Sequence, residues 1–285
     1  MALRDYLGEQ RLSILAAYRP TGIVHYIGLA YPARDNRLRI FIPAGHCAGG
    51  AHCLHEGALV TVHLDNRTGI DAFDAELHVY RASYKGRVVA VEDNWLTLVP
   101  VEFTLIHGID VVEEHREPGY AFPADPRPPR ALPTSPLTRL GTLEERDHDN
   151  KIGVLTTFAQ GQPHTTVLAF LSTVDDDIFV ISVPDTFKLH VLEREPRCVF
   201  TIDERAKFTF EASIDWNYTI LETRAHVVPA TAPLYEEVRQ AFIRKNPWEV
   251  GFFIIPGLTM LHLSHGDVVA AGEPRPLPAN LTAGR

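Results

Sequence analysis

The sequence predicts a mainly β protein with a few helices, arranged as two domains of similar size. The chain has 285 residues, whereas a typical single domain has about 100–150. A segment with seven prolines, residues 117–136, divides the chain near its middle. Because proline fixes φ and removes a backbone donor, this segment should run extended over the surface. We therefore predict domains at 1–116 and 137–285, joined by a linker at 117–136.

The second half contains a series of short β-branched and apolar runs. Residues 152–158 and 165–171 flank a Gly- and Pro-containing turn, which is typical of a hairpin. Apolar residues in 233–245 recur at helical spacing and predict an amphipathic helix, and a shorter helix is expected around 189–192, ended by Pro196. Further strands are predicted at 178–183, 197–203, 207–214, 219–228 and 251–264.

The first half repeats this plan weakly. Residues 41–65 and 179–203 are both 25 residues long and lie at an offset of 138. Four identities connect them, which is little above chance, but both windows predict a strand, a small-residue loop, a short helix and a strand ending in Asp. We infer a tandem duplication. The identical pairs are Phe41/Phe179, His52/His190, Leu54/Leu192 and Asp65/Asp203.

Five segments of the second half carry a resemblance to a known family. They are Gly153–Thr157, Gly161–His164, Ile178–Ile181, Thr186–Leu189 and Leu192–Arg197. In this order and spacing they resemble the pyridoxamine 5′-phosphate oxidase-like family of FMN-binding split β-barrels. Members of this family commonly dimerise and bind flavin between two barrels. The resemblance therefore implies tandem split β-barrels that form a pseudo-dimer within one chain.

The resemblance also implies which residues hold the cofactor. Lys188 and Thr186 match positions that contact the flavin phosphate, and Ser182 lies at the end of the preceding strand. Thr165, Thr166, Val167 and Leu168 match the strand that lies along the ring and ribityl chain. A phosphate favours a cation and several donors where a loop enters a helix. The alternative is that Lys188 is a solvated surface lysine. The first half has Gly50 at the position equivalent to Lys188, so a second phosphate site of this kind is not expected.

The function that this resemblance implies is a flavin (FMN)-dependent oxidoreductase acting on a small molecule, with catalytic residues that the sequence leaves unknown. Deazaflavin F420 could replace FMN. Two alternatives stay open: a haem-binding protein, either haem-degrading or haem-dependent, and a non-catalytic cofactor-binding module. Binding alone does not establish catalysis, because fold does not fix function.

Histidines and cysteines supply other candidate chemistry. His46, Cys47, His52, Cys53 and His55 crowd into ten residues, and thiolate with imidazole suits zinc or haem iron. Their spacing matches no standard zinc site, and a glycine-rich turn is the ordinary interpretation. Elsewhere, histidines at 164, 190 and 226 could donate protons near a cofactor, although each is more often a structural residue.

Charge and composition exclude several classes. The net charge of −9 opposes binding to nucleic acid. The sequence has no run of about 18 apolar residues, which a membrane-spanning helix needs. Its first residues show no secretory signal pattern. Three cysteines cannot all pair. We therefore expect a cytoplasmic protein with a small-molecule substrate, no nucleic-acid or membrane partner, and self-association left open.

Overall fold

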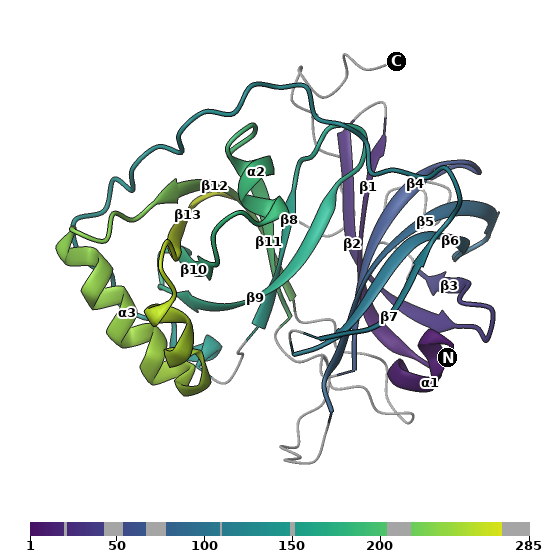
Figure 1. Cartoon of the computed structure of the whole chain (residues 1–285), viewed down its shortest axis with the longest axis horizontal. Coiled ribbons are helices and arrows are strands. Elements are labelled where there is room, and N and C mark those ends of the chain that lie inside the picture. Colours follow the sequence, from purple (N-terminus) through teal and green to yellow (C-terminus); the bar gives the residue numbers. More distant parts are fainter. Residues whose placement is uncertain are drawn as a thin grey trace.

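The computed structural model describes residues 1–19, 22–42, 54–66, 78–108, 110–148, 152–203 and 218–269. Within these residues the protein is mainly β, with two closed antiparallel barrels that lie side by side (Figure 1). Each barrel comes from one half of the chain. The sequence prediction of tandem split β-barrels is therefore confirmed.

The first barrel closes through the order β3-β2-β1-β4-β5-β6, with β3 paired to β6. β7 pairs with β6 as an additional strand, and the short helix α1 buries Leu3 and Leu7 against the core. The elements are α1 (Leu3–Leu7), β1 (Arg11–Arg19), β2 (Gly22–Pro32), β3 (Leu38–Phe41), β4 (Leu59–Asp65), β5 (Tyr80–Glu92), β6 (Trp95–His107) and β7 (Asp110–Arg116).

The second barrel closes through the order β10-β9-β8-β11-β12-β13 and back to β10. The amphipathic helix α3 packs outside it, burying Leu234, Val238, Ala241 and Phe242 as predicted. The elements are η2 (Glu145–Asp147), β8 (Ile152–Thr157), β9 (His164–Ser172), β10 (Ile178–Ser182), α2 (Phe187–Leu192), β11 (Arg197–Asp203), β12 (Tyr218–Val227), α3 (Pro233–Lys245), η3 (Pro247–Ile254) and β13 (Thr259–Val269).

The two barrels have the same connectivity. Replacing each strand of the first barrel by the strand seven places later gives the order of the second. β4 and β11 begin at Leu59 and Arg197, which are 138 residues apart. This shared topology makes the chain a pseudo-dimer. One difference is that β5 and β6 form a direct hairpin, whereas α3 and η3 lie between β12 and β13.

The predicted strand at 251–264 is wrong over its first part. Pro247 begins a 3-10 helix that continues to Ile254, and Gly257 then turns with φ of 78°. Strand pairing starts only at Thr259, which lies opposite Ser182. Proline lacks the donor that a strand requires, so the apolar residues here are held by turns. The strand predicted at 207–214 lies outside the described residues.

Apolar side chains fill both barrels and the seam between them. Alternate strand residues point inward, and the seam is formed by side chains that point outward. Leu12, Ile14 and Ile27 pack against Val154 across this seam. A second cluster joins Ile23 of the first barrel to residues of the second. The two halves are thus held together by apolar packing between the barrels.

Polar contacts and the linker also cross the seam. Gln162, in the turn between β8 and β9, donates through Nε2 to the carbonyl oxygen of Val60 at 3.1 Å. Residues 117–136 contain no helix or strand beyond one bridge of Thr134 to Val227, and they run along one side of both barrels (Figure 1). None of the described helices is long and apolar enough to cross a membrane.

Candidate functional site

Lys188 occupies an unusual position for a lysine. It lies in the first turn of α2, and only 7% of the residue is exposed. Among the described residues, no carboxylate or hydrogen-bond acceptor contacts its Nζ. Burial lowers the pKa of Lys188 to about 8. The alternative of a solvated surface lysine is therefore wrong, and none of the described residues supplies a counter-charge to this cation.

Lys85 of the first barrel lies on the same side of the seam. It is on β5, where it is 6% exposed, and its Nζ donates to Ser83 Oγ at 2.9 Å and lies 3.6 Å from Glu102 Oε1. Burial lowers the pKa of Lys85, and Glu102 opposes that change. The charge of Lys85 is thus partly balanced, whereas no described residue balances the charge of Lys188.

His164, the first residue of β9, lies between these two lysines. Burial, with the charges of Lys85 and Lys188, lowers the pKa of His164 to about 3, so its ring is neutral near pH 7. Its Nε2 lies 3.2 Å from Thr166 Oγ1. Its Nδ1 is buried and has no hydrogen-bond partner among the described residues. A buried polar atom without a partner is costly, so Nδ1 is suited to bind a ligand.

Two phenylalanines enclose this group. The rings of Phe122, from the linker, and Phe187, from α2, have centroids 5.0 Å apart. The His164 ring lies 6.1 Å from the first and 4.8 Å from the second, both edge to face. Phe122 also lies 6.0 Å from Lys85 Nζ. The linker therefore forms part of the wall, and the aromatic rings limit the access of water to the cations.

The other predicted phosphate contacts lie near α2 but are already hydrogen-bonded. Ser182 Oγ donates to the Val183 carbonyl oxygen at 3.0 Å and lies 3.0 Å from Thr186 Oγ1. α2 spans only six residues, so its N-terminus adds no anion site of its own. Of the predicted phosphate contacts, Lys188 is therefore the one whose polar atom has no hydrogen-bond partner among the described residues.

The residues predicted to lie along the flavin separate onto two faces of β9. Thr166 lies on the face with His164 and contacts it, and Leu168 packs on the barrel core. Thr165 faces the other way, is 2% exposed, and its Oγ1 has no partner among the described residues. Val167 lines a cavity between the barrels. These side chains do not form a single surface.

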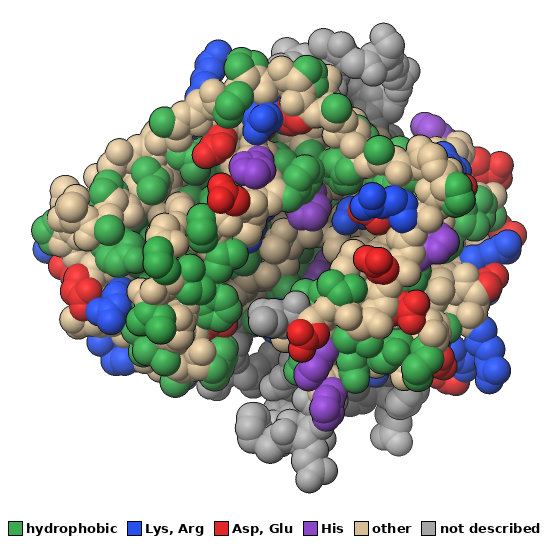
Figure 2. All heavy atoms as spheres, viewed as in Figure 1, with side chains coloured by type: hydrophobic (Ala, Val, Ile, Leu, Met, Phe, Trp, Pro, Cys, Tyr) green, Lys and Arg blue, Asp and Glu red, His purple; other side chains and the backbone are tan. Residues whose placement is uncertain are grey.

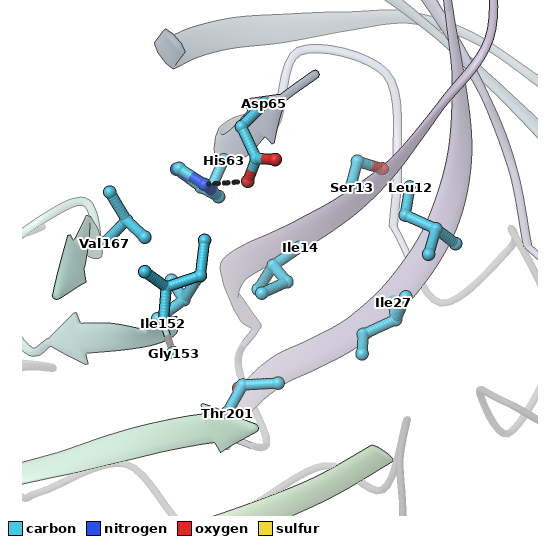
Figure 3. A pocket seen from close by; sticks show the side chains of 11 residues that line it. Leu12, Ser13, Ile14, Ile27, His63, Asp65, Ile152, Gly153, Val167 and Thr201 are labelled. Atoms are coloured by element: carbon cyan, nitrogen blue, oxygen red, sulfur yellow. Dashed lines mark hydrogen bonds and ion pairs between the residues drawn. The ribbon is translucent and has the colours of Figure 1, made fainter. Parts of the chain in front are cut away.

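The cavity lined by Val167 contains a pair that the sequence analysis missed (Figure 3). His63 Nε2 lies 3.0 Å from Asp65 Oδ2, and both side chains are buried. Opposite them lie Ile152 and Gly153 of the second barrel. The cavity has a volume of about 20 Å³, which suits roughly one water molecule and not a flavin ring. The alternation of Thr61, His63 and Asp65 with apolar residues of β4 could have indicated an outward-facing polar row.

The remaining candidates stay apart from the lysines. His46, Cys47, His52 and Cys53 lie outside the described residues. His55 is exposed, and its Nδ1 donates to the Glu56 carbonyl oxygen at 2.9 Å. Within the described part of the chain, no group of three or more His, Cys, Asp or Glu residues could hold a metal ion.

The other side of the pseudo-dimer does not reproduce the pair formed by Lys85 and Lys188. In the first barrel, Lys85 lies opposite Thr61. The counterpart of Thr61 in the second barrel is Val199, and the residue opposite Val199 is Glu222. Lys188 corresponds in sequence to Gly50. One side of the pseudo-dimer therefore combines two lysines, whereas the equivalent positions on the other side carry Gly and Glu. On the face shown in Figure 2, histidine and basic side chains lie beside the hollow where the two halves meet.

Comparisons with known proteins give a similar fold at low identity. Neither a family model nor a curated protein matches the sequence. HutZ, a heme storage protein from Vibrio cholerae, is 18% identical over 46% of this chain and 92% of its own, with a TM-score of 0.38. An FAD-binding protein from Mesorhizobium loti is 16% identical over 42% of this chain and 82% of its own, with a TM-score of 0.34.

A heme-binding protein from Mycobacterium smegmatis is 12% identical over 44% of this chain and 55% of its own, with a TM-score of 0.35. The described neighbours thus include both flavin-binding and haem-binding proteins. At these identities and TM-scores they give no basis for assigning a function to this chain.

Proposed function

We propose that the protein binds the phosphate of FMN at Lys188 and Lys85 and acts as a flavin-dependent oxidoreductase on a small molecule. The observation that carries this proposal is the buried Lys188 ammonium, for which the described residues provide no counter-charge. A buried charge is costly unless a partner of opposite sign compensates it. An anionic ligand would supply that partner.

The surrounding groups favour a phosphate over a simple halide or a carboxylate. Two cations and the Nδ1 atom of neutral His164 come from separate elements, so they can approach different oxygens of one group. Charge-assisted hydrogen bonds to such oxygens are stronger than neutral ones. Glu102 balances only part of the positive charge, because it pairs with both Lys85 and Arg116.

The protein's own contribution would be to bind, orient and exclude water. Lys188 and Lys85 would fix the phosphate, and His164 would add a hydrogen bond while remaining uncharged. Phe122 and Phe187 would keep water from the cations, which strengthens electrostatic contacts. When bound, the flavin supplies the hydride or electron transfer that the side chains themselves cannot perform.

Haem binding receives no support from the described residues. Both cysteines and two of the three histidines proposed as ligands lie outside these residues, and the third histidine, His55, is exposed at the surface. A deazaflavin remains compatible with the lysines, because its side chain also carries a phosphate. FMN is therefore the ligand that we propose, and we compare its binding with the binding of a flavin that lacks the phosphate.

The test compares FMN with riboflavin, which lacks the phosphate. Each is titrated into the wild-type protein and into Lys188→Met, Lys188→Arg and Arg34→Met, and binding is measured by flavin fluorescence and calorimetry. Arg34 is exposed, so its variant removes one positive charge away from the site. We expect Lys188→Met to weaken FMN binding by about tenfold to a hundredfold, and Lys188→Arg to retain most of it.

Riboflavin binding should be weak and insensitive to Lys188, because it has no phosphate. The redox step is then tested by FMN-dependent oxidation of NADH or NADPH in the wild-type protein. If FMN and riboflavin bind equally, or Lys188→Met binds FMN as tightly as the wild type, the phosphate site is refuted. If FMN binds through Lys188 but no redox turnover is found with any electron donor, the protein is a flavin-binding module and not an oxidoreductase.

A further inference from the structure

A groove lies beside Phe122 and Phe187, the two rings that contact His164. It runs between linker residues 122–125 and one face of α2, and its volume is about 270 Å³. Phe187, Val191 and Arg194 follow one another at the spacing of a single helix face. This volume is near the lower end of the roughly 300–1,000 Å³ of small-molecule sites. The groove is therefore large enough for a ligand fragment.

The walls of the groove are aromatic and partly exposed. Phe122 and Phe187 line it together with Val191, and Phe187 is 44% exposed. An exposed aromatic ring beside a concave surface offers a flat apolar face on which another ring can stack. The groove thus favours a planar aromatic group.

One end of the groove carries the cation Arg194, which forms no ion pair with a carboxylate of the described residues. Arg194 donates through Nη1 to the His190 carbonyl oxygen at 2.7 Å, and its Nε is buried without a partner among the described residues. Asp125 also lines the groove, but its Oδ1 accepts from Arg127 Nε at 2.8 Å. Although burial opposes it, hydrogen bonding to Arg127 holds the pKa of Asp125 below its usual value. Arg194 is therefore available to an anion.

The groove and the lysine site share two residues. Phe122 and Phe187 line the groove and also contact His164, which lies beside Lys188. A phosphate held at Lys188 and an anion held at Arg194 would thus belong to adjacent sites that share these rings. A dinucleotide contains this combination: two linked phosphates and a planar base.

We propose that the groove binds the adenosine phosphate half of a dinucleotide, with the second phosphate at Arg194 and the adenine against Phe187. This inference rests on the proposed flavin site and extends it: FAD would occupy both parts, whereas FMN would occupy only the Lys188 part. A separate adenine nucleotide would present the same chemistry to the groove.

The experiment measures binding of FMN, FAD and 5′-AMP to the wild-type protein, Arg194→Met, Phe187→Ala and the control Arg34→Met. We expect FAD to bind about tenfold more tightly than FMN. Arg194→Met should remove this advantage and leave the affinity for FMN unchanged. Phe187→Ala, whose ring also contacts His164, should lower the ratio of FAD affinity to FMN affinity. Binding of 5′-AMP that depends on Arg194, without any advantage of FAD, assigns the groove to a separate nucleotide and supports the shared chemistry.

The two proposals fail in different ways. If FMN binds through Lys188 but neither FAD nor 5′-AMP responds to Arg194 or Phe187, the groove proposal is overturned and the flavin site stands. If 5′-AMP binds in an Arg194-dependent manner and neither flavin binds, the groove stands and the proposed flavin function is overturned. Circular dichroism of each variant shows whether it is folded, and Phe187→Leu replaces Phe187→Ala if the latter is not.

Discussion

Replacing Lys188 by Met should stabilise the ligand-free protein while it weakens FMN binding. Burial lowers the pKa of Lys188 from 10.5 to about 8, which corresponds to about 3 kcal/mol of destabilisation of the charged form. Met has a similar unbranched stem and no charge. We therefore expect the free energy of unfolding at pH 7 to rise by up to about 3 kcal/mol, because the stem contacts are largely retained.

The stability difference between the wild type and Lys188→Met should depend on pH. The folded-state pKa lies below the unfolded value, so between about pH 8 and 10.5 the unfolded chain binds more protons at Lys188 than the folded protein does. Stability of the wild type therefore rises with pH across this window. Lys188→Met lacks this rise, so its advantage should be full below pH 8 and should disappear above pH 10.5.

Urea unfolding of the wild type, Lys188→Met and Arg34→Met at several pH values measures this difference. Arg34→Met, at an exposed position, controls for the loss of one positive charge. The reasoning is refuted if Lys188→Met is less stable than the wild type at pH 7, or if the difference between them does not change from pH 7 to pH 10. Greater stability with weaker ligand binding would show that the buried cation is retained for function.

Three further predictions concern the same site and its support. FMN binding at pH 8.5 should take up protons, because an anion raises the pKa of Lys188 above about 8; calorimetry in buffers of different ionisation enthalpy measures this uptake. Gly153→Ala should destabilise the second barrel by about 1–3 kcal/mol, since a Cβ there would lie 2.5 Å from the Phe200 ring, and the urea midpoint checks it. His262→Phe should loosen the linker, because His262 Nδ1 lies 2.8 Å from Ser135 Oγ, and limited proteolysis within 117–136 should become faster.

Each of these has a clear contrary result. Heats of FMN binding that do not depend on the buffer would show that Lys188 does not contact the phosphate. A Gly153→Ala protein as stable as the wild type would mean that the Phe200 ring moves at little cost. Unchanged proteolysis of His262→Phe would show that backbone hydrogen bonds, such as that from Ser135 to the Val227 carbonyl oxygen, hold the linker alone.

Local sequence patterns predicted much of the fold. The β-branched runs that became β8–β11 and the helical spacing of α3 are properties of neighbouring residues, so they can be recognised without three-dimensional information. Residues 251–255 misled the prediction because Gly-Phe-Phe-Ile-Ile has strand-like composition. The prolines at 247 and 256 exclude regular pairing there, and the 3-10 helix forms instead.

The site was less accessible to sequence analysis. Lys188 could be predicted because its local motif resembles that of a known family. Lys85 could not, since the segment around it has no distinctive pattern, and only the folded arrangement of the two barrels brings its charge close enough to act on His164. His164 was considered as a proton donor, but its low pKa depends on burial and on two lysines that are 79 and 24 residues away in the chain. Such a charge arrangement is a property of the folded seam.

The two halves of the chain differ at the lysine positions, and this difference predicts how many FMN molecules bind per chain. A homodimer of single barrels must carry two identical sites, whereas a tandem chain can change one of them without changing the other. Here the position equivalent to Lys188 is Gly50 and the position equivalent to Lys85 is Glu222, and a carboxylate repels a phosphate. We therefore expect one FMN per chain by calorimetry and absorbance. If two FMN molecules bind per chain and both still bind to Lys188→Met, these cations do not select the site. If one FMN binds, and Lys188→Met loses it while Glu222→Gln retains it, the FMN lies on the lysine side of the seam.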